Sequence, residues 1–63
     1  MKLYIKEILA KKDLSVYWLQ KETGISQPTI YKIANNQTKM ITFDNLELLC
    51  KALDCTPNDI FGY

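Results

Sequence analysis

Several residue types are missing from this sequence or scarce in it. Among 63 residues there is no histidine and no arginine, and there are two cysteines, two glycines and two prolines. Histidine is the commonest general base and a frequent zinc ligand, and Cys50 and Cys55 alone cannot complete an ordinary zinc site. A chain of this length also has little room to enclose a ligand pocket of roughly 300 Å³ or more. We therefore expect no enzymatic activity, no metal or other cofactor, and no small-molecule ligand.

Long apolar runs are absent as well. No run of apolar residues reaches ten, whereas a membrane-spanning helix needs about 20 and the core of a secretory signal about 7 to 15. The sequence therefore favours a cytoplasmic protein without membrane contact. Two cysteines are too few for the disulfide framework of a small secreted protein, and on a continuous helix Cys50 and Cys55 would point apart. An intramolecular disulfide is not expected, while an intermolecular one stays open.

The residues that are present are typical of a small folded domain with an uneven charge distribution. Hydrophobic residues make up 48% of the chain, and eight lysines face seven acidic residues for a net charge of +1. Because a domain averages about 100 to 150 residues, residues 1–63 leave room for a single one. No acidic residue lies between Glu22 and Asp44, a stretch that contains Lys32 and Lys39. The middle third of the chain is therefore locally positive.

Helices are predicted where apolar residues recur at helical intervals between capping residues. On these signals we predict helices over about 2–12, 16–23 and 26–34, a fourth that follows Thr42 and includes Leu53, and a fifth over about 56–61. The expected N-caps are Ser15, Ser26, Thr42 and Thr56, and the expected helix-ending residues are Asp13, Gly24, Asn35 and Asn36. No alternation typical of strands appears, so the predicted fold is all-α.

The second and third of these helices are joined by a short turn. The turn contains Gly24, which adopts a left-handed conformation at little cost, and Ile25, which can fill the corner between the helices. Two helices joined in this way form a helix-turn-helix, whose second helix lies in the major groove of DNA. The pattern predicts a helix-turn-helix over about residues 16–35.

Most of the chain resembles one known family. The resemblance to the helix-turn-helix of the Cro/C1-type (XRE) family is carried by Leu14–Leu19, Lys21–Gln27 and Thr29–Ile33. The resemblance to the fourth and fifth helices of its minimal, stand-alone members, the YozG-like regulators, is carried by Leu48–Ile60. It implies a compact, five-helix, lambda-repressor-like DNA-binding domain that regulates transcription, generally as a dimer.

The third helix has an outward face that suits base recognition. With about 100° between successive residues, Ile30 and Ile33 mark its buried side. The residues expected on the outward side are Pro28, Tyr31, Lys32 and Asn35, and Gln27 is expected at the N-terminal tip. Glutamine can bridge adenine N6 and N7, lysine can reach guanine O6 and N7, and proline can contact a thymine methyl group. The resemblance implies base reading at Gln27, Pro28 and Lys32, while Tyr31 either stacks on a sugar or packs over a neighbouring helix.

Polar residues around this helix are candidates for contacts with DNA phosphates, which position a protein without reading sequence. They are Ser15, Thr29, Asn35, Asn36, Thr38, Lys39 and Thr42. For Lys32 and Lys39 the alternative is an ordinary solvated surface position.

Together these features predict a sequence-specific regulator of transcription that binds a double-stranded DNA operator, as a repressor rather than an activator. Because the half-sites of palindromic DNA lie about 34 Å apart, a homodimer is expected. Ile60, Phe61 and Tyr63 are either its contacts or the lid of the core. The alternative is a protein-interaction module on the same scaffold, such as an antirepressor, an antitoxin-like protein or a phage inhibitor. Its surface would be formed by Tyr17 and Trp18, which otherwise pack on the first helix and the C-terminus.

Overall fold

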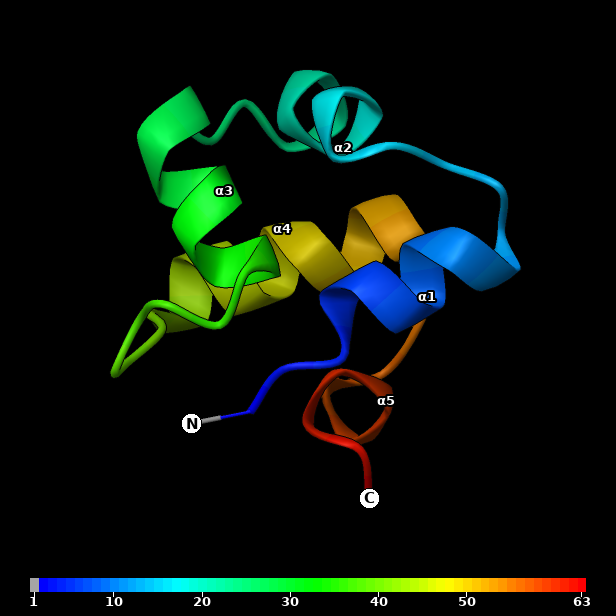
Figure 1. The fold of residues 1–63 in the computed structure, drawn as a ribbon. Coiled ribbons are helices and arrows are strands. Elements are labelled where there is room, and N and C mark those ends of the chain that lie inside the picture. The colour runs from blue at the N-terminus through cyan, green and yellow to red at the C-terminus, as the bar shows by residue number, and fades with distance from the viewer. Residues whose placement is uncertain (1) are drawn as a thin grey trace.

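Helices make up nearly all of the regular structure in this protein, for which a computed structural model describes residues 2–63. In chain order they are α1 (Ile5–Lys11), α2 (Val16–Thr23), α3 (Gln27–Ala34), α4 (Phe43–Leu53) and α5 (Pro57–Phe61). No strand occurs within residues 2–63. The predicted all-α fold of five helices is therefore confirmed (Figure 1).

The hydrophobic core lies where the helices meet around α4. Helix α4 packs against α2 and α5, and α3 packs against α2 and α1; Figure 1 shows α4 through the middle of the molecule with α5 below it. The core consists of Leu3, Ile5, Leu9, Leu19, Ile25, Ile30, Ile33, Ala34, Leu49, Leu53 and Ile60. Most of the apolar residues whose spacing predicted the helices belong to this core, whereas Ile8 and Leu46 are partly buried against it. The resulting body is compact, with extents of 25 × 23 × 19 Å.

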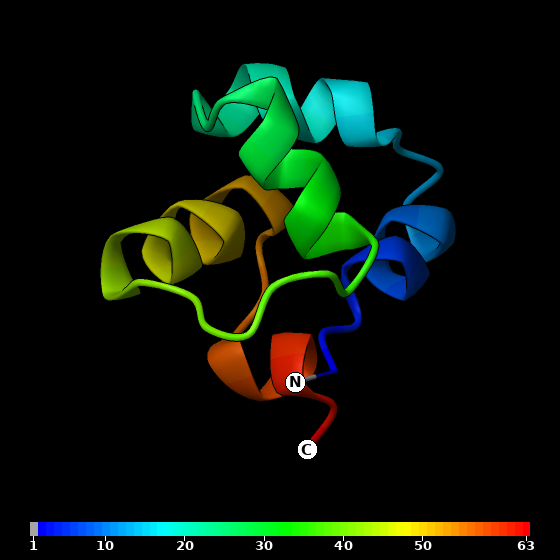
Figure 2. The same ribbon diagram turned by 60° about the vertical axis from the view of Figure 1, so that its left-hand side comes forward.

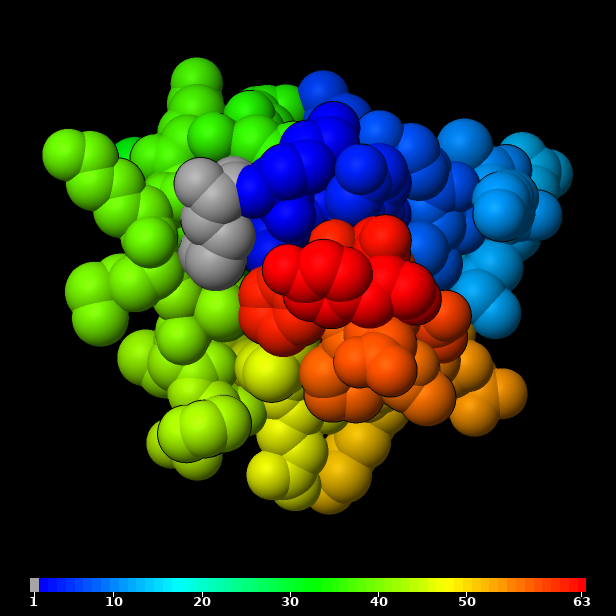
Figure 3. Space-filling view, turned by 90° about the horizontal axis from the view of Figure 1, so that it is seen from below, coloured from blue at the N-terminus to red at the C-terminus, as the bar shows by residue number. Residues whose placement is uncertain are grey.

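The start of α1 differs from the sequence prediction. The helix begins at Ile5 rather than at residue 2, because contacts with distant residues hold the preceding segment in a non-helical conformation. The N–H of Leu3 donates to the side-chain oxygen of Asn36 at 2.6 Å, and the N–H of Tyr4 donates to the carbonyl of Ile60 at 2.8 Å. Both partners lie far away in the sequence, and Leu3 is drawn fully into the core. Figure 3 shows the first described residues in blue directly against α5 in red.

All four predicted N-cap residues occupy N-cap positions, and three of them accept the expected hydrogen bond from the following helix. The hydroxyls of Ser15 and Thr42 each accept a hydrogen bond from the third residue of the following helix, at 3.0 and 3.1 Å, and Thr56 forms a full capping box. Ser26 occupies the N-cap position of α3, but its hydroxyl donates to Thr29 Oγ1 at 3.0 Å and accepts no backbone N–H. One reason is that Pro28 has no N–H to donate in the first turn.

The predicted left-handed helix end at Asp13 is confirmed by its φ of 57°, and Gly24 ends α2 with a φ of 73°. Helix α4 also ends at a left-handed residue, Asp54, with a φ of 51°. The chain reverses there, so that the N–H of Cys55 donates to the carbonyl of Cys50 at 3.1 Å. Such reversed turns satisfy the free carbonyls at a helix end.

This reversal corrects the prediction that the side chains of Cys50 and Cys55 point apart. They do not lie on one continuous helix, because α4 ends before Cys55, and the thiol of Cys50 is close enough to influence that of Cys55. Both thiols are free. Burial raises the pKa of Cys50, and burial together with Cys50 and Asp59 raises the pKa of Cys55 to about 11. Both are therefore protonated, and weakly reactive, at neutral pH.

None of the helices within residues 2–63 has the length and apolar character that crossing a membrane requires.

Candidate nucleic-acid interface

Helices α2 and α3 are joined by the three residues Gly24, Ile25 and Ser26, as the helix-turn-helix pattern predicts. Thr23, which was not predicted to have a role, stabilises this turn. The hydroxyl of Thr23 donates to the carbonyl of Leu19 at 2.8 Å and accepts from the N–H of Ile25 at 3.2 Å. Thr23 is the one buried polar residue among residues 2–63. Its two bonds fix the end of α2 against the start of α3.

The outward face of α3 carries the residues predicted to read bases. Gln27, Pro28, Tyr31 and Lys32 are all exposed, while Ile30 and Ile33 are buried on the opposite side. Tyr31 is only just exposed, at 38%, so the domain covers part of its side chain. The four side chains therefore form one accessible strip along the first two turns of α3, called here the α3 face.

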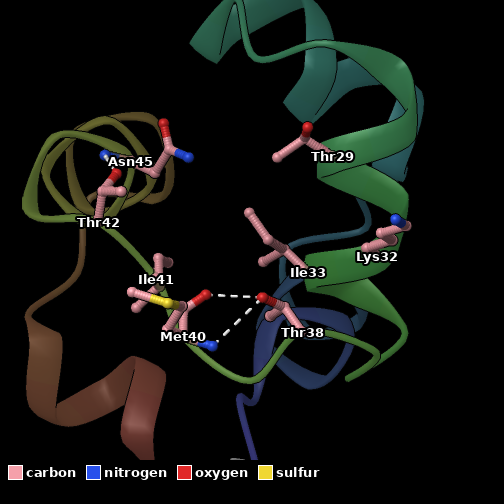
Figure 4. Close-up of a pocket in the computed structure, with 8 residues that line it drawn as sticks. All are labelled: Thr29, Lys32, Ile33, Thr38, Met40, Ile41, Thr42 and Asn45. Carbon is pink, nitrogen blue, oxygen red and sulfur yellow. Dashed lines mark hydrogen bonds between the residues drawn. The ribbon is translucent and has the colours of Figure 1, made fainter.

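A groove runs beside the α3 face, between α3 and the start of α4. It has a volume of about 110 Å³ and is lined by Thr29, Lys32, Ile33, Thr38, Met40, Ile41, Thr42 and Asn45. In Figure 4, Thr29 points from α3 toward Asn45 at the start of α4, and Ile33 projects from α3 below Thr29. Lys32 lies on the outer edge of α3. The groove thus has polar rims and an apolar floor.

The free hydroxyl protons of this region decide which residues can donate to a phosphate. Ser15 and Thr42 only accept bonds from their own helices, and Thr29 only accepts from Ser26. Their hydroxyl protons therefore remain available. Thr38 differs, because its hydroxyl donates to the carbonyl of Met40 at 2.6 Å to hold the loop. Thr38 cannot donate to a phosphate while this bond exists.

The two asparagines at the end of α3 form hydrogen bonds that stabilise the fold. The backbone N–H of Asn35 donates to Tyr31, and that of Asn36 donates to Ile33. Asn36 also adopts a left-handed conformation with a φ of 59° and accepts the hydrogen bond from Leu3. Asn36 was a candidate phosphate contact, but its backbone N–H is already bonded and so is not free for a phosphate. Asn35 keeps an exposed side chain.

The charge around the groove is positive on α3 and in the following loop. The stretch from residue 23 to residue 43 contains no acidic residue. The ion pairs within residues 2–63 join Lys2 to Glu7 and Lys51 to Glu47, so neither Lys32 nor Lys39 is neutralised by a carboxylate partner. The acids nearest in sequence are Glu22, ten residues before Lys32, and Asp44, five residues after Lys39 in the first turn of α4. The free positive charge therefore lies on the α3 side of the groove.

Asn45 is a second residue that the sequence reasoning missed. Its backbone N–H bonds to Thr42, and its half-buried side chain faces the groove. A side-chain amide can donate to a phosphate or to a base edge. The sequence contained a signal for this residue. Asn45 follows the N-cap Thr42 by three residues, so it belongs to the first turn of α4, where polar groups can bind an anion.

The remaining candidate residues lie away from this groove. Ile60 is fully buried and belongs to the core, so it is a lid residue and not a surface contact, whereas Tyr63 is 93% exposed.

Trp18 is half-buried against the core, while Tyr17 is exposed with the Lys21 ammonium 5.3 Å from its ring centre. The two aromatic residues therefore do not form one exposed patch. Within residues 2–63, no three metal-ligating side chains come together.

Comparison with known proteins agrees with this geometry. The family model described as "Cro/C1-type HTH DNA-binding domain" matches residues 4–63. The chain is also similar to the "Uncharacterized HTH-type transcriptional regulator YozG" of Bacillus subtilis (strain 168). The two are 39% identical over 59 residues, which cover 94% of this chain and 70% of that protein. No solved structure matches the chain.

Proposed function

Because this chain belongs to the family of Cro/C1-type helix-turn-helix DNA-binding domains, we propose that it binds double-stranded DNA in a sequence-specific manner. In this proposal residues 1–63 act as one domain whose helix α3 enters the major groove. The observation that carries the proposal is the α3 face, where Gln27, Pro28 and Lys32 are exposed together. It lies in a stretch free of acidic residues, so DNA phosphates approach it without repulsion from carboxylates.

Base reading is assigned to the α3 face. Gln27 lies at the N-terminal tip of α3, the part of a recognition helix that comes closest to base edges. Its amide suits adenine, the ammonium group of Lys32 suits guanine, and the ring of Pro28 suits a thymine methyl group. Tyr31 flanks these residues and is assigned to a contact with the sugar or the base edge.

Phosphate contacts are assigned to the rims of the groove, to the loop after α3 and to the N-cap of α2. Ser15, Thr29 and Thr42 have hydroxyl protons to donate, Lys39 has a free ammonium group, and Asn45 adds an amide. These contacts hold the domain in register on the duplex and contribute affinity for any sequence. The exposed side chain of Asn35 is a further candidate.

The biological role that follows is regulation of transcription at an operator. A domain of this size that occupies DNA acts most simply by excluding other proteins, so we assign it as a repressor. It reads a palindrome as a homodimer, because one small domain contacts only a few base pairs and binds weakly.

The proposal is tested by selecting duplexes from a random DNA pool with the purified protein at near-physiological salt, followed by sequencing. The expected result is an inverted repeat with half-site centres about one helical turn, or 34 Å, apart. The variant Gln27→Ala is selected in parallel and is expected to change the preferred bases within each half-site. If a folded protein enriches no sequence, the proposal is wrong, and the scaffold serves protein interaction instead.

A further inference from the structure

A second surface, on α4 and the first turn of α5, exposes apolar side chains. Phe43, the first residue of α4, is 88% exposed and lies outside the core cluster. Beside it is a hollow of about 300 Å³, lined by Phe43, Leu46, Glu47, Cys50 and Pro57. Leu46 and Cys50 lean partly into the core, so the floor of the hollow is apolar. An exposed phenylalanine beside an apolar hollow is typical of a contact surface.

This surface, called here the α4 face, is separate from the groove that faces α3. With about 100° between successive helix residues, Phe43 and Asn45 lie about 160° apart around the axis of α4. Asn45 lines the groove beside α3, whereas Phe43 lines the hollow beside Pro57. The DNA contacts assigned above therefore leave the α4 face uncovered.

We infer that the α4 face joins two copies of this chain, with Phe43 of each copy inserted into the hollow of the other. The inference rests on the proposed function, since it names the surface of the homodimer that reads a palindrome. In a two-fold contact the same patch is used twice, so a protruding group must lie beside the cavity that accepts its copy. Phe43 and the hollow between Leu46, Cys50 and Pro57 meet this condition.

The charges on α4 also fit a second copy. The exposed side of the helix carries Asp44 and Glu47 in its first half and Lys51 in its last turn, where Lys51 pairs with Glu47 of the same helix at 3.2 Å and Asp44 has no such partner within residues 2–63. If two α4 helices pack antiparallel, the acidic half of one helix lies against the basic end of the other. A parallel arrangement would instead place Asp44 against Asp44, which is unfavourable. The α4 face is thus an apolar centre with a rim that is complementary to itself.

The position of the α4 face suits two DNA-reading helices. Figure 2 shows α3 crossing the front of the domain, with α4 on its left-hand side. A two-fold contact on this flank lets both α3 helices face the same side. Half-sites about 34 Å apart require each α3 to lie about 17 Å from the two-fold axis, which is within the 25 Å extent of the domain.

The alternative contact, through Phe61 and Tyr63, fits less well. These residues lie at the chain termini, and Figure 1 shows the termini at the end of the domain away from α2 and α3. A two-fold contact there would hold the two α3 helices at opposite ends of the dimer. One straight duplex could not then lie across both helices.

The test is the oligomeric state, measured by sedimentation equilibrium for the wild type, Phe43→Glu and Tyr63→Glu. Both substituted side chains are highly exposed, so both variants are expected to fold, which circular dichroism checks. The wild type is expected to dimerise at micromolar concentrations, and Phe43→Glu to raise the dimer dissociation constant about tenfold or more. Tyr63→Glu is the matched control and is expected to leave it unchanged. A wild type that stays monomeric, or a dimer that Phe43→Glu leaves intact or that Tyr63→Glu dissociates, would overturn the inference.

Charge reversal tests the antiparallel arrangement. Lys51→Glu is expected to weaken the dimer. Adding Asp44→Lys in the same chain is expected to restore it, because positions 44 and 51 then again carry opposite charges across the two-fold axis. A double variant as weak as Lys51→Glu would contradict the antiparallel arrangement.

Binding to DNA separates this inference from the proposed function. A duplex with one half-site should bind Phe43→Glu as well as it binds the wild type, whereas a duplex with two half-sites should bind the variant without cooperativity. If neither protein binds any duplex but the wild type still dimerises through Phe43, the proposed function fails and the α4 contact stands.

Discussion

The backbone N–H of Leu3 donates a hydrogen bond of 2.6 Å to the side-chain oxygen of Asn36. This bond joins the N-terminal segment to the turn that ends α3, although the two residues are 33 positions apart. Asn36 therefore has two structural roles, since it also adopts the left-handed conformation that stops the helix. The end of α3 is held by the same bond that keeps Leu3 in the core.

We expect Asn36→Ala to lower the free energy of unfolding by about 2 to 3 kcal/mol, measured by urea denaturation. The loss combines a half-buried N–H without its partner and the strain of a left-handed alanine. Asn36→Gly is the control, because glycine removes the hydrogen bond but adopts the left-handed conformation freely. It should lose less stability than Asn36→Ala. Equal stability of the wild type and Asn36→Gly would mean that the bond to Leu3 contributes nothing.

The two N-cap serines of the helix-turn-helix should respond differently to alanine. Ser15 accepts a hydrogen bond from a backbone N–H of α2, so Ser15→Ala should cost about 1 kcal/mol of stability. Ser26 accepts none and bonds to Thr29 instead, so Ser26→Ala should cost roughly half as much or less. Thermal unfolding of both variants under the same conditions checks the difference, and the reverse order would refute it.

Thr23→Val tests the bonds that hold the turn between α2 and α3. Valine has nearly the same shape, but it leaves the buried N–H of Ile25 without the acceptor it has in the wild type. An unsatisfied buried donor costs about 1 to 3 kcal/mol, so we expect a loss in that range in urea denaturation. Thr23→Ser, which keeps the hydroxyl, is the control and should lose less. A fully stable Thr23→Val would show that the turn does not depend on this hydroxyl.

The capping box of α5 should make stability depend on acid pH. Hydrogen bonds from the backbone N–H and the hydroxyl of Thr56 lower the pKa of Asp59 below its usual 3.8. A lowered pKa in the folded state means that the contribution is present above the unfolded value and is lost as the pH falls through the folded value.

Denaturation midpoints between pH 2 and pH 6 check this expectation. The wild type should lose stability below about pH 4, and Asp59→Asn should lose less over the same range. Glu7, whose pKa is lowered by its own backbone N–H and by Lys2, contributes in the same direction, so Glu7→Gln serves as the comparison. Identical pH profiles for Asp59→Asn and the wild type would count against the capping box as the cause.

Lys39 and Gln27 should separate phosphate contact from base reading. Lys39→Ala should weaken binding to all duplexes and reduce the slope of log affinity against log salt by about 1. Gln27→Ala should change the order of preference among half-sites and leave the salt slope almost unchanged. Fluorescence anisotropy at several salt concentrations measures both. If the two variants lose affinity equally on every duplex, the division of roles is wrong.

Much of the fold could be predicted from the sequence because its signals are local. The caps at Ser15, Thr42 and Thr56 involve residues within one turn, so their sequence positions are sufficient to identify them. The same holds for Gly24 and Asp13, which end helices through their own backbone conformations. The outward positions of Pro28, Tyr31 and Lys32 followed from the spacing of Ile30 and Ile33, and that of Gln27 followed from its place at the N-terminal tip of the helix.

The features that could not be predicted depend on contacts between distant segments. The predicted start of α1 was wrong because Asn36 and Ile60, which come much later in the chain, hold the segment before Ile5 in a non-helical conformation. The groove position of Asn45 and the exposure of Phe43 depend on how α4 lies against α3 and α5. The position of a residue on a helix is readable from sequence, but the neighbour it faces is not.

A ribosome joins Tyr4 to the chain long before Ile60, yet the N–H of Tyr4 is bonded to the carbonyl of Ile60 in the folded protein. Ile60 also covers the core to which Leu3 and Ile5 belong. The earliest core residues therefore stay without their final covering until α5 has left the exit tunnel. Folding should therefore wait for the emergence of α5, and the nascent chain should offer its apolar residues to chaperones until then.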